Sequence, residues 1–411
     1  MTSSSDGAAP SPVAERLGSA LIVLLLALLL GVQPITTDLY LPALPGLAAD
    51  LRAPMTQTQL TLSALLFTFG GSQLLLGPAA DRWGRRPVLL VGLALYVAGG
   101  VGGTFAGQIE TLIGWRALQG VGVGAAVVCA RAMVRDLYVP TEGARVMSKA
   151  LSGLGIIALS SPLVGGLLAG AFGWRSALLG CALFGAATLA LVALKLPETA
   201  RTLNPRALQP LPMLQQWLRI ARHPTFVAWA ALVAATYGGL FAFLAGSAFV
   251  LIDVLGSSRL AAGGYIACSS ASYIAGTFWC RHWLLRHGLA GSVRRGAWFT
   301  LAGGAAMVAL AYAGVVGPWA IVGPQMLFAF GHGIHQPCGQ AAVVGPFPQH
   351  AGAASALAGF ILAAVAVGVG GWLGFAMDGT AKPLVLTIGT MAAATAAIAW
   401  TLVQRHGEGA G

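Results

Sequence analysis

Two oppositely charged side chains lie in or beside long uncharged stretches, where they could take part in proton exchange. Asp38 follows the uncharged run 17–37, and Arg116 interrupts the apolar stretch 111–134. An isolated charge at the centre of a lipid bilayer costs ~2.5–3.5 kcal/mol on the mildest scale. Apolar surroundings favour the protonated carboxyl group, whereas a nearby guanidinium favours the carboxylate. We hypothesise that protonation of Asp38 loosens its contact with Arg116 and that a substrate competes with this proton; the alternative is a fixed ion pair between two helices.

The two charges can meet only if their helices place them at similar depth. Asp38 lies about 21 residues into its run, which puts it about 32 Å from the start of a helix that rises ~1.5 Å per residue. Arg116 lies about 8 Å beyond Thr111 on a helix that enters from the opposite side. We expect the first helix to continue past Asp38 toward Pro42, so that both side chains fall in the outer third of the bilayer and meet there.

A second group of side chains could line a cavity between such helices. Aromatic and uncharged polar residues are suited to binding small, mostly apolar molecules. The candidates for the cavity wall are Tyr40, Phe67, Gln73, Gln119, Tyr237, Phe241, Tyr273, His332 and His335. The alternative for each aromatic residue is packing or contact with lipid, and for Gln119 a hydrogen bond between helices.

His332 and His335 are three residues apart and so lie on similar faces of one helix. Because imidazole titrates near neutral pH, the pair could relay protons or contact a substrate. The alternative is an interhelical hydrogen bond for each ring. No carboxylate or thiol lies close to the pair in sequence, so we expect no metal site there.

Known catalytic patterns are missing from the sequence. It contains no GxSxG, HExxH or GxxxxGK[ST] segment, and the five cysteines form neither a CxxC pair nor a zinc-binding spacing. The cysteines lie in apolar runs, where we interpret them as small packing residues. We therefore predict no enzyme and no cofactor, and any transport must draw on an ion gradient or on the gradient of the substrate itself.

The composition indicates that these residues are carried by membrane-spanning helices. Of 411 residues, 57% are hydrophobic and only 9% are charged, against roughly 25% in a soluble domain. The net charge of +11 is spread over short clusters between apolar runs, which favours contact with a lipid bilayer and not with nucleic acid.

The uncharged runs predict twelve spans of about 20 residues each. Single spans are expected over 17–37, 53–80, 87–109, 111–134, 150–174, 176–194, 224–252, 260–280 and 383–404, and three more within 296–377. Within that long run, Gly317-Pro318 and the segment 346–350 are the natural breaks. The fold class is therefore an all-α membrane protein with two six-helix, pseudo-symmetric bundles.

Positively charged residues predict the orientation, because Lys and Arg concentrate in cytoplasmic loops. Of the 23 Lys and Arg residues, 18 fall inside when the N-terminus is cytoplasmic, since Arg116 lies in the membrane and only four lie outside: Arg52, Arg175, Arg259 and Lys382. The expected parts are a disordered cytoplasmic N-terminus (1–16), a first bundle (17–195), a cytoplasmic linker (196–224), a second bundle (225–404) and a cytoplasmic tail (405–411).

The segment after the second predicted span carries a specific motif. Its sequence, Gly77-Pro-Ala-Ala-Asp81-Arg82-Trp-Gly84-Arg85-Arg86, resembles the GxxxDRxGRR signature of the major facilitator superfamily. The resemblance implies a conformational latch built from Gly77, Asp81, Arg82, Gly84, Arg85, Arg86 and Asp136. We also expect Asp81 to interact with the N-terminal dipole of the eleventh span, near His350; the alternative is a set of solvated loop charges.

Further segments narrow the resemblance. Thr37-Asp38-Leu-Tyr40-Leu-Pro42, Arg116-Ala-Leu-Gln119-Gly120 and Gly239-Leu-Phe241-Ala-Phe243 are similar to segments of the bicyclomycin-resistance (Bcr/CflA) family of drug:proton antiporters. The antiporter pattern GPxxGG of that fold is present here as Ser161-Pro162-Leu-Val-Gly165-Gly166, so Pro162, Gly165 and Gly166 match it and the first glycine does not.

The resemblance implies a monomeric multi-pass protein of the bacterial inner membrane that exports small molecules in exchange for protons. A metabolite exporter or proton-coupled importer on the same fold is the nearest alternative. A membrane receptor or scaffold without transport is a more distant one.

Overall fold

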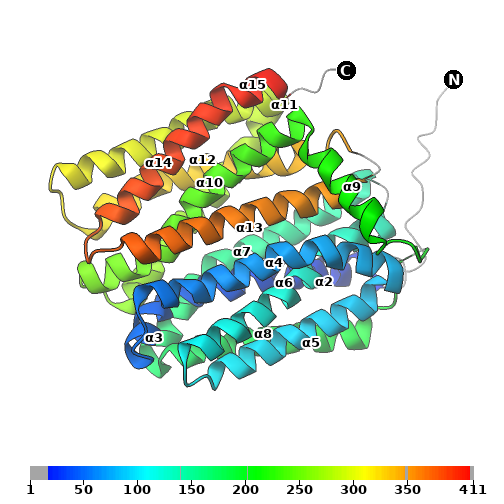
Figure 1. The fold of residues 1–411 in the computed structure, drawn as a ribbon, viewed down its shortest axis with the longest axis horizontal. Helices are drawn as coiled ribbons and strands as arrows, with labels where there is room; N and C mark the ends of the chain where they lie inside the picture. The colour runs from blue at the N-terminus through cyan, green and yellow to red at the C-terminus, as the bar shows by residue number, and fades with distance from the viewer. Residues whose placement is uncertain (1–16, 139, 201, 348–349, 408–411) are drawn as a thin grey trace.

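The computed structural model describes residues 17–138, 140–200, 202–347 and 350–407, and these residues form an all-helical structure (Figure 1). The elements are α2 (Ser19–Asp38), the 3-10 helix η1 (Leu41–Ala43), α3 (Leu44–Asp50), α4 (Met55–Trp83), α5 (Arg85–Thr104), α6 (Ile109–Leu137), α7 (Pro140–Phe172), α8 (Trp174–Lys195), α9 (Pro210–Ala221), α10 (Pro224–Phe249), the π-helix η2 (Val250–Val254), α11 (Arg259–Tyr312), α12 (Pro318–Ala342), α13 (Ala351–Ala376), α14 (Lys382–Trp400) and α15 (Leu402–His406). The expected disordered segment 1–16 and residues 408–411 of the expected tail lie outside the described residues.

The described helices account for twelve spans. Nine of the described segments are long and apolar enough by themselves to cross a bilayer. At 54 residues α11 would extend ~81 Å, far more than a bilayer needs, and its backbone is broken at Gly288, where φ is 63°. The two halves of α11 together with α12 complete the twelve, as the sequence predicted. The long uncharged run divides near Gly317 and after Ala342, close to the expected breaks.

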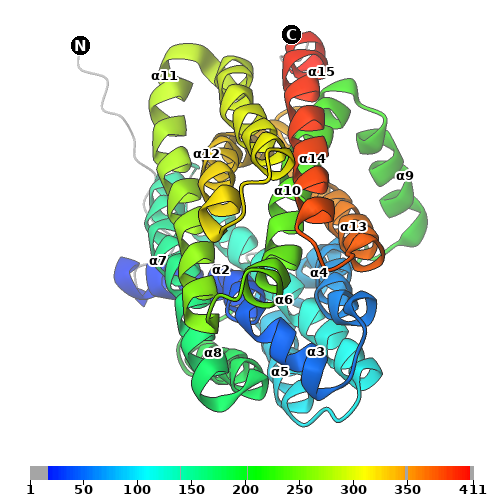
Figure 2. The ribbon, with the colours of Figure 1, turned by 90° about the vertical axis from the view of Figure 1, so that its left-hand side faces the viewer.

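The helices form two groups that follow the order of the chain. Helices α2 to α8 pack on one another, α10 to α14 do the same, and the groups meet mainly where α4 contacts α13 and where α7 contacts α11 (Figures 1 and 2). Proline at the start of α10 and of α12 suits the first helical turn, where a missing N–H breaks no hydrogen bond. The expected linker is not purely a connection, because it contains the helix α9.

Hydrogen bonds between the two groups are concentrated at one end of the molecule. At the end that carries α3, Thr56 donates to the carbonyl of Gly374 (3.0 Å), Gln59 to that of Ala245 (2.5 Å) and Arg259 to that of Ala169 (3.1 Å). At the opposite end, the described residues provide one such bond, from Arg131 to Ser355 (2.9 Å). Among the described residues, the hydrogen bonds that join the two bundles therefore lie chiefly at the α3 end.

Candidate functional site

Arg116 is the centre of a fully buried polar cluster between α2 and α6. Its Nη2 donates to the carbonyl of Thr36 (2.9 Å), and its Nη1 donates to Oε1 of Gln119 (2.8 Å). The guanidinium also lies over the ring of Tyr40, 4.2 Å from the centroid, and the Tyr40 hydroxyl donates to Thr61 (3.0 Å). The end of α2, the turn at Tyr40 and α6 itself thus surround one buried cation.

The end of α2 explains why Arg116 lies there. The last four carbonyls of a helix have no partner inside it and carry partial negative charge. Because α2 ends at Asp38 and the chain turns into η1, the carbonyl of Thr36 is one of these groups. The cation of Arg116 therefore satisfies the C-terminal end of α2. As expected, the first span continues helically past Asp38 and Pro42, but its α-helical hydrogen bonding ends at Asp38 and gives way to a turn and the 3-10 helix η1.

Asp38 does not pair with Arg116 in this conformation. Among the residues described, the side-chain partner of Asp38 is its neighbour Thr37, whose hydroxyl donates to Oδ1 at 2.7 Å. In place of the expected contact, Nη1 and Nη2 of Arg116 are bound by an amide oxygen and a backbone oxygen. Asp38 is half-buried, and its charge acts on the phenol of Tyr237 in α10. The acid thus lies at the boundary between the two bundles.

An aromatic group faces this boundary from the second bundle. The rings of Tyr237 and Phe241 stack with centroids 6.5 Å apart, and the ring of His332 lies 6.4 Å from that of Tyr237 and 5.5 Å from that of Tyr273. Nδ1 of His332 shares a hydrogen bond with the hydroxyl of Thr236 (3.1 Å). The structure therefore brings four of the candidate wall residues together on α10, α11 and α12.

The remaining candidate wall residues are placed differently. Phe67 is 48% exposed and its ring lies 6.1 Å from that of Phe360, so it lies between the bundles on α4. Gln73 is nearly buried where α4 meets Gly359 of α13. Gln119 is fully buried against α5 and Tyr40 lies against Arg116, so both support the arginine instead of lining a cavity.

His335 points away from the aromatic group. Its ring lies against Gly296 in the second half of α11, and neither ring nitrogen has a hydrogen-bond partner in the described structure although the residue is fully buried. Two further side chains of α12, the buried Gln325 and the half-buried Gln336, also have buried polar atoms without a partner in the described structure. Such groups cost about 1–3 kcal/mol each when they are left unsatisfied. Each of these unpartnered groups has the chemistry to bind water or a polar ligand group.

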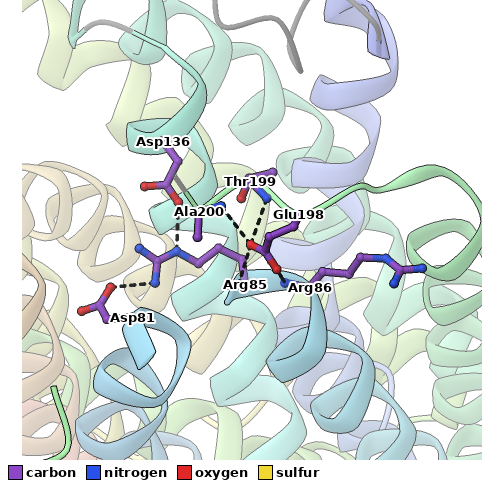
Figure 3. A network of polar contacts seen from close by, with 7 residues as sticks. All are labelled: Asp81, Arg85, Arg86, Asp136, Glu198, Thr199 and Ala200. Atoms are coloured by element: carbon purple, nitrogen blue, oxygen red, sulfur yellow. Dashed lines mark hydrogen bonds and ion pairs between the residues drawn. The ribbon is translucent and has the colours of Figure 1, made fainter. Parts of the chain in front are cut away.

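A compact charge cluster joins the ends of α4, α5 and α6 (Figure 3). Nη1 of Arg85 lies 2.6 Å from Asp81, and its Nε lies 2.9 Å from Asp136. The Arg85 side chain is only 6% exposed, whereas that of Asp81 is 45% exposed. All three residues belong to the first bundle, so in this conformation the cluster fixes the ends of three helices relative to one another.

Residues 26–371, most of the chain, match the model of the Major Facilitator Superfamily. The chain belongs to the major facilitator superfamily. Members of this superfamily are transporters and not enzymes, in agreement with the missing catalytic motifs. The transporter is therefore a multi-pass membrane protein.

Several relatives and solved structures are similar to this transporter. It is 30% identical to Multidrug resistance protein D of Escherichia coli over 82% of the chain and 84% of the relative. It is 25% identical to the Bicyclomycin resistance protein homolog of Haemophilus influenzae over 95% of the chain and 98% of the relative. It is 39% identical to the Chloramphenicol resistance protein of Pseudomonas aeruginosa over 37% of each chain. The crystal structure of a D-xylose-proton symporter shares the fold, with 16% identity and a TM-score of 0.74 over 93% of this chain and 97% of the symporter. The resemblance to the bicyclomycin-resistance family is confirmed.

The motif between α4 and α5 depends on a residue that the sequence analysis missed. Oε1 of Glu198 accepts the backbone N–H of Arg85 (2.8 Å), and Oε2 accepts that of Arg86 (3.0 Å), so this carboxylate caps the N-terminus of α5. In return, Arg86 donates to the carbonyls of Ala193 (3.0 Å) and Leu196 (2.8 Å) at the end of α8. The two helix ends cap each other.

The remaining motif residues fit this arrangement. Gly84 separates α4 from α5 with φ at 99°, and a Cβ there would meet Glu198. Gly77 faces Val128 of α6 at ordinary contact distance, and the exposed Arg82 lies over the ring of Trp83. In the described structure Asp81 does not contact the start of α13, contrary to expectation; its side chain is held by Arg85 one helical turn away, and α13 is met by Arg131 instead.

The proline and glycines of α7 allow close approach of other helices. The carbonyl of Pro162 lies against Gly263 of α11, Gly165 against the carbonyl of Leu39, and Gly166 against Arg259. A side chain at Gly165 would collide with the backbone that directly follows Asp38. This part of α7 therefore packs between the end of α2 and the second bundle.

Replacement of Glu198 by Gln is expected to lower the free energy of unfolding by about 1 kcal/mol, because a neutral amide caps the N-terminus of α5 less well. The measurement is thermal unfolding of the purified protein in detergent. Glu110→Gln is the matched control, since Glu110 lies in the first turn of α6 but is exposed and has only a long contact with Gln57 (3.4 Å). Equal unfolding temperatures for the two variants would remove the capping role from Glu198.

Proposed function

We propose that the transporter is a monomer that exports small, mostly apolar molecules across the bacterial inner membrane in exchange for protons. Both termini are then cytoplasmic, and residues 17–195 and 225–404 are the two bundles that rock about the boundary between them. The names of the relatives, which refer to resistance against drugs, support this choice of substrate class. The observation that carries the proposal is a half-buried carboxyl group, Asp38, at the bundle boundary without a cationic partner among the residues that the structure describes.

Proton exchange at Asp38 follows from its separation from Arg116. The guanidinium is held by Thr36 and Gln119, and the described part of the chain gives the carboxylate no compensating ion pair in this state. It can be neutralised by a proton or stabilised by a bound molecule, and the two compete for the same group. A proton arriving from outside therefore displaces the substrate, and a substrate arriving from the cytoplasm displaces the proton.

The bonding pattern between the bundles gives this conformation a place in the cycle. The α3 end is held together by three hydrogen bonds, so the bundles separate more easily at the end that carries α9 and α15. We assign that end to the cytoplasm. The state is then the one in which substrate enters from the cytoplasm, and export requires the bonds of Thr56, Gln59 and Arg259 to break.

The chemistry of the wall favours substrates with a flat apolar part. Tyr237 and Tyr273 are partly exposed aromatic residues of the second bundle, backed by the buried rings of Phe241 and His332. The half-exposed Phe67 adds a ring on the first bundle. Aromatic rings add about 0.5–1.5 kcal/mol for each favourable pair beyond the area that they bury. The Asp81–Arg85–Asp136 cluster acts as the latch, because it keeps α4, α5 and α6 moving as one body.

Expression of the transporter in a pump-deficient bacterium tests the proposal. Susceptibility is measured for phenicols, bicyclomycin-like compounds and cationic dyes, together with efflux before and after the proton gradient is collapsed. We expect a several-fold rise in the inhibitory concentration of at least one class and efflux that stops with the gradient. Uphill uptake of a metabolite would instead favour an importer. No change for any compound, with the protein present in the membrane, would refute drug export.

A further inference from the structure

The helix α9 lies outside the membrane-spanning core. Its 12 residues extend only ~18 Å, too short to cross a bilayer. It lies at the edge of the molecule, beside α13 and the start of α10 (Figure 2). One face is held by the protein: Ile220 is 1% exposed and packs with Phe226 and Trp229.

A second stripe of α9 is left uncovered. Leu211, Leu214 and Leu218 repeat at the three- and four-residue spacing of one helix face and are 65%, 50% and 47% exposed. The stripe runs into a surface cavity whose wall is partly cationic. Gln215, Leu218, Arg219, Arg222, His223 and Pro224 line this cavity.

The charges in this cavity are uncompensated. Arg219 and Arg222 are exposed and have no ion pair among the residues that the structure describes. Nδ1 of His223 is buried without a hydrogen-bond partner, while its ring lies 5.1 Å from that of Phe347. His223 directly precedes α10, so the positive end of that helix adds to the two guanidinium groups. An anion with an attached apolar chain matches this combination of groups.

We propose that this cavity binds the phosphate headgroup of an anionic phospholipid from the cytoplasmic leaflet. The headgroup lies between Arg219 and Arg222, and an acyl chain covers the stripe formed by Leu211, Leu214 and Leu218. Short amphipathic helices with basic residues lie in the bilayer interface in this way. The lipid then anchors the linker between the bundles and the N-terminus of α10. This inference rests on the proposed function for the orientation that places α9 in the cytoplasm.

Native mass spectrometry of the full chain, titrated with phosphatidylglycerol and separately with phosphatidylethanolamine, tests the site. Removal of both charges by Arg219→Gln and Arg222→Gln is expected to weaken phosphatidylglycerol binding by roughly fivefold for each arginine. Arg286→Gln with Arg294→Gln is the matched control, because these exposed arginines lie on α11, away from the cavity. The control variant is expected to bind like the original chain.

A second variant tests the apolar part of the site. Leu214→Gln with Leu218→Gln is expected to weaken phosphatidylglycerol binding too, whereas excess soluble glycerol phosphate is expected not to displace the lipid. The proposal would be overturned if the Arg219→Gln/Arg222→Gln variant bound phosphatidylglycerol as well as the Arg286→Gln/Arg294→Gln control. Displacement of the lipid by soluble glycerol phosphate would also overturn it. Lipid-free dimers that vanish in the leucine variant would also overturn it, because they assign the stripe to a second copy of the chain. The assay measures lipid binding and not transport. Failure of the lipid site can therefore be distinguished from failure of the proposed drug export.

Discussion

Replacement of Asp38 by Asn is expected to reduce proton-driven export by about 10²-fold, the low end of the effect of removing an essential proton-transfer group. The amide cannot lose or gain the proton that the cycle requires. It keeps the shape of the side chain, and the Thr37 hydroxyl can still donate to its oxygen. The measurement is drug transport into proteoliposomes under an imposed pH gradient. Folding is expected to be unchanged, so the loss lies in coupling and not in assembly.

Asp253→Asn is the matched control for this variant. Asp253 is an exposed acid in η2, the π-helix that follows α10, and none of the elements that contact Arg116 contains it. It is expected to transport at the rate of the original chain. Undiminished export by the Asp38 variant would remove this carboxyl group from the mechanism. An equal loss in both variants would point to a general effect of the lost negative charge.

Replacement of Arg116 by Met is expected to lower the free energy of unfolding by about 2–5 kcal/mol. The change leaves the carbonyl of Thr36 and the amide oxygen of Gln119 buried without donors, at about 1–3 kcal/mol each, and it removes the contact with the Tyr40 ring. Arg116→Lys is expected to be intermediate, because one ammonium group cannot reach all three partners. Thermal unfolding in detergent, together with the amount of protein in the membrane, measures both changes.

Comparison with two other variants isolates the cause. The exposed Arg52 is the control, and Arg52→Met is expected to unfold close to the original temperature. Asp38→Asn is expected to do the same, because Asp38 is not paired with Arg116 in the described structure. If Asp38→Asn were as destabilising as Arg116→Met, the two side chains would form an ion pair, and the fixed-pair alternative would be favoured.

The arrangement of spans could be predicted because bilayer thickness limits it directly. Uncharged runs of about 20 residues have few alternatives in a chain with so few charges, and Gly317 with Pro318 marks a break that no span can cross easily. The division of α11 into two spans depends on the backbone break at Gly288. This break lies in the charged segment 281–295, which separates two uncharged runs in the sequence. The short-range cluster of Asp81 and Arg85 follows from a spacing of four residues.

The contacts of Arg116 could not be predicted, because they depend on where α2 ends. The apolar run gives no signal near Asp38 for the change from α-helix to turn and 3-10 helix that frees the carbonyl of Thr36. Glu198 was missed for a different reason: it lies 112 and 113 residues from its partners Arg86 and Arg85 and carries no periodic signal.

The helix α9 could have been found from the sequence. Met213, Trp217 and Ile220 form one apolar stripe at helical spacing, and Leu211, Leu214 and Leu218 form another. The Pro-rich and Arg-rich composition of the linker concealed this pattern.

Proton release on substrate addition tests the central claim most directly. The purified protein is placed in weakly buffered detergent solution near neutral pH, a transported drug is added, and the change in pH is recorded alongside binding of the drug. The account predicts acidification with the original chain and none with Asp38→Asn. Equal acidification by both proteins, or drug binding by the original chain without any release of protons, would contradict competition between substrate and proton at Asp38.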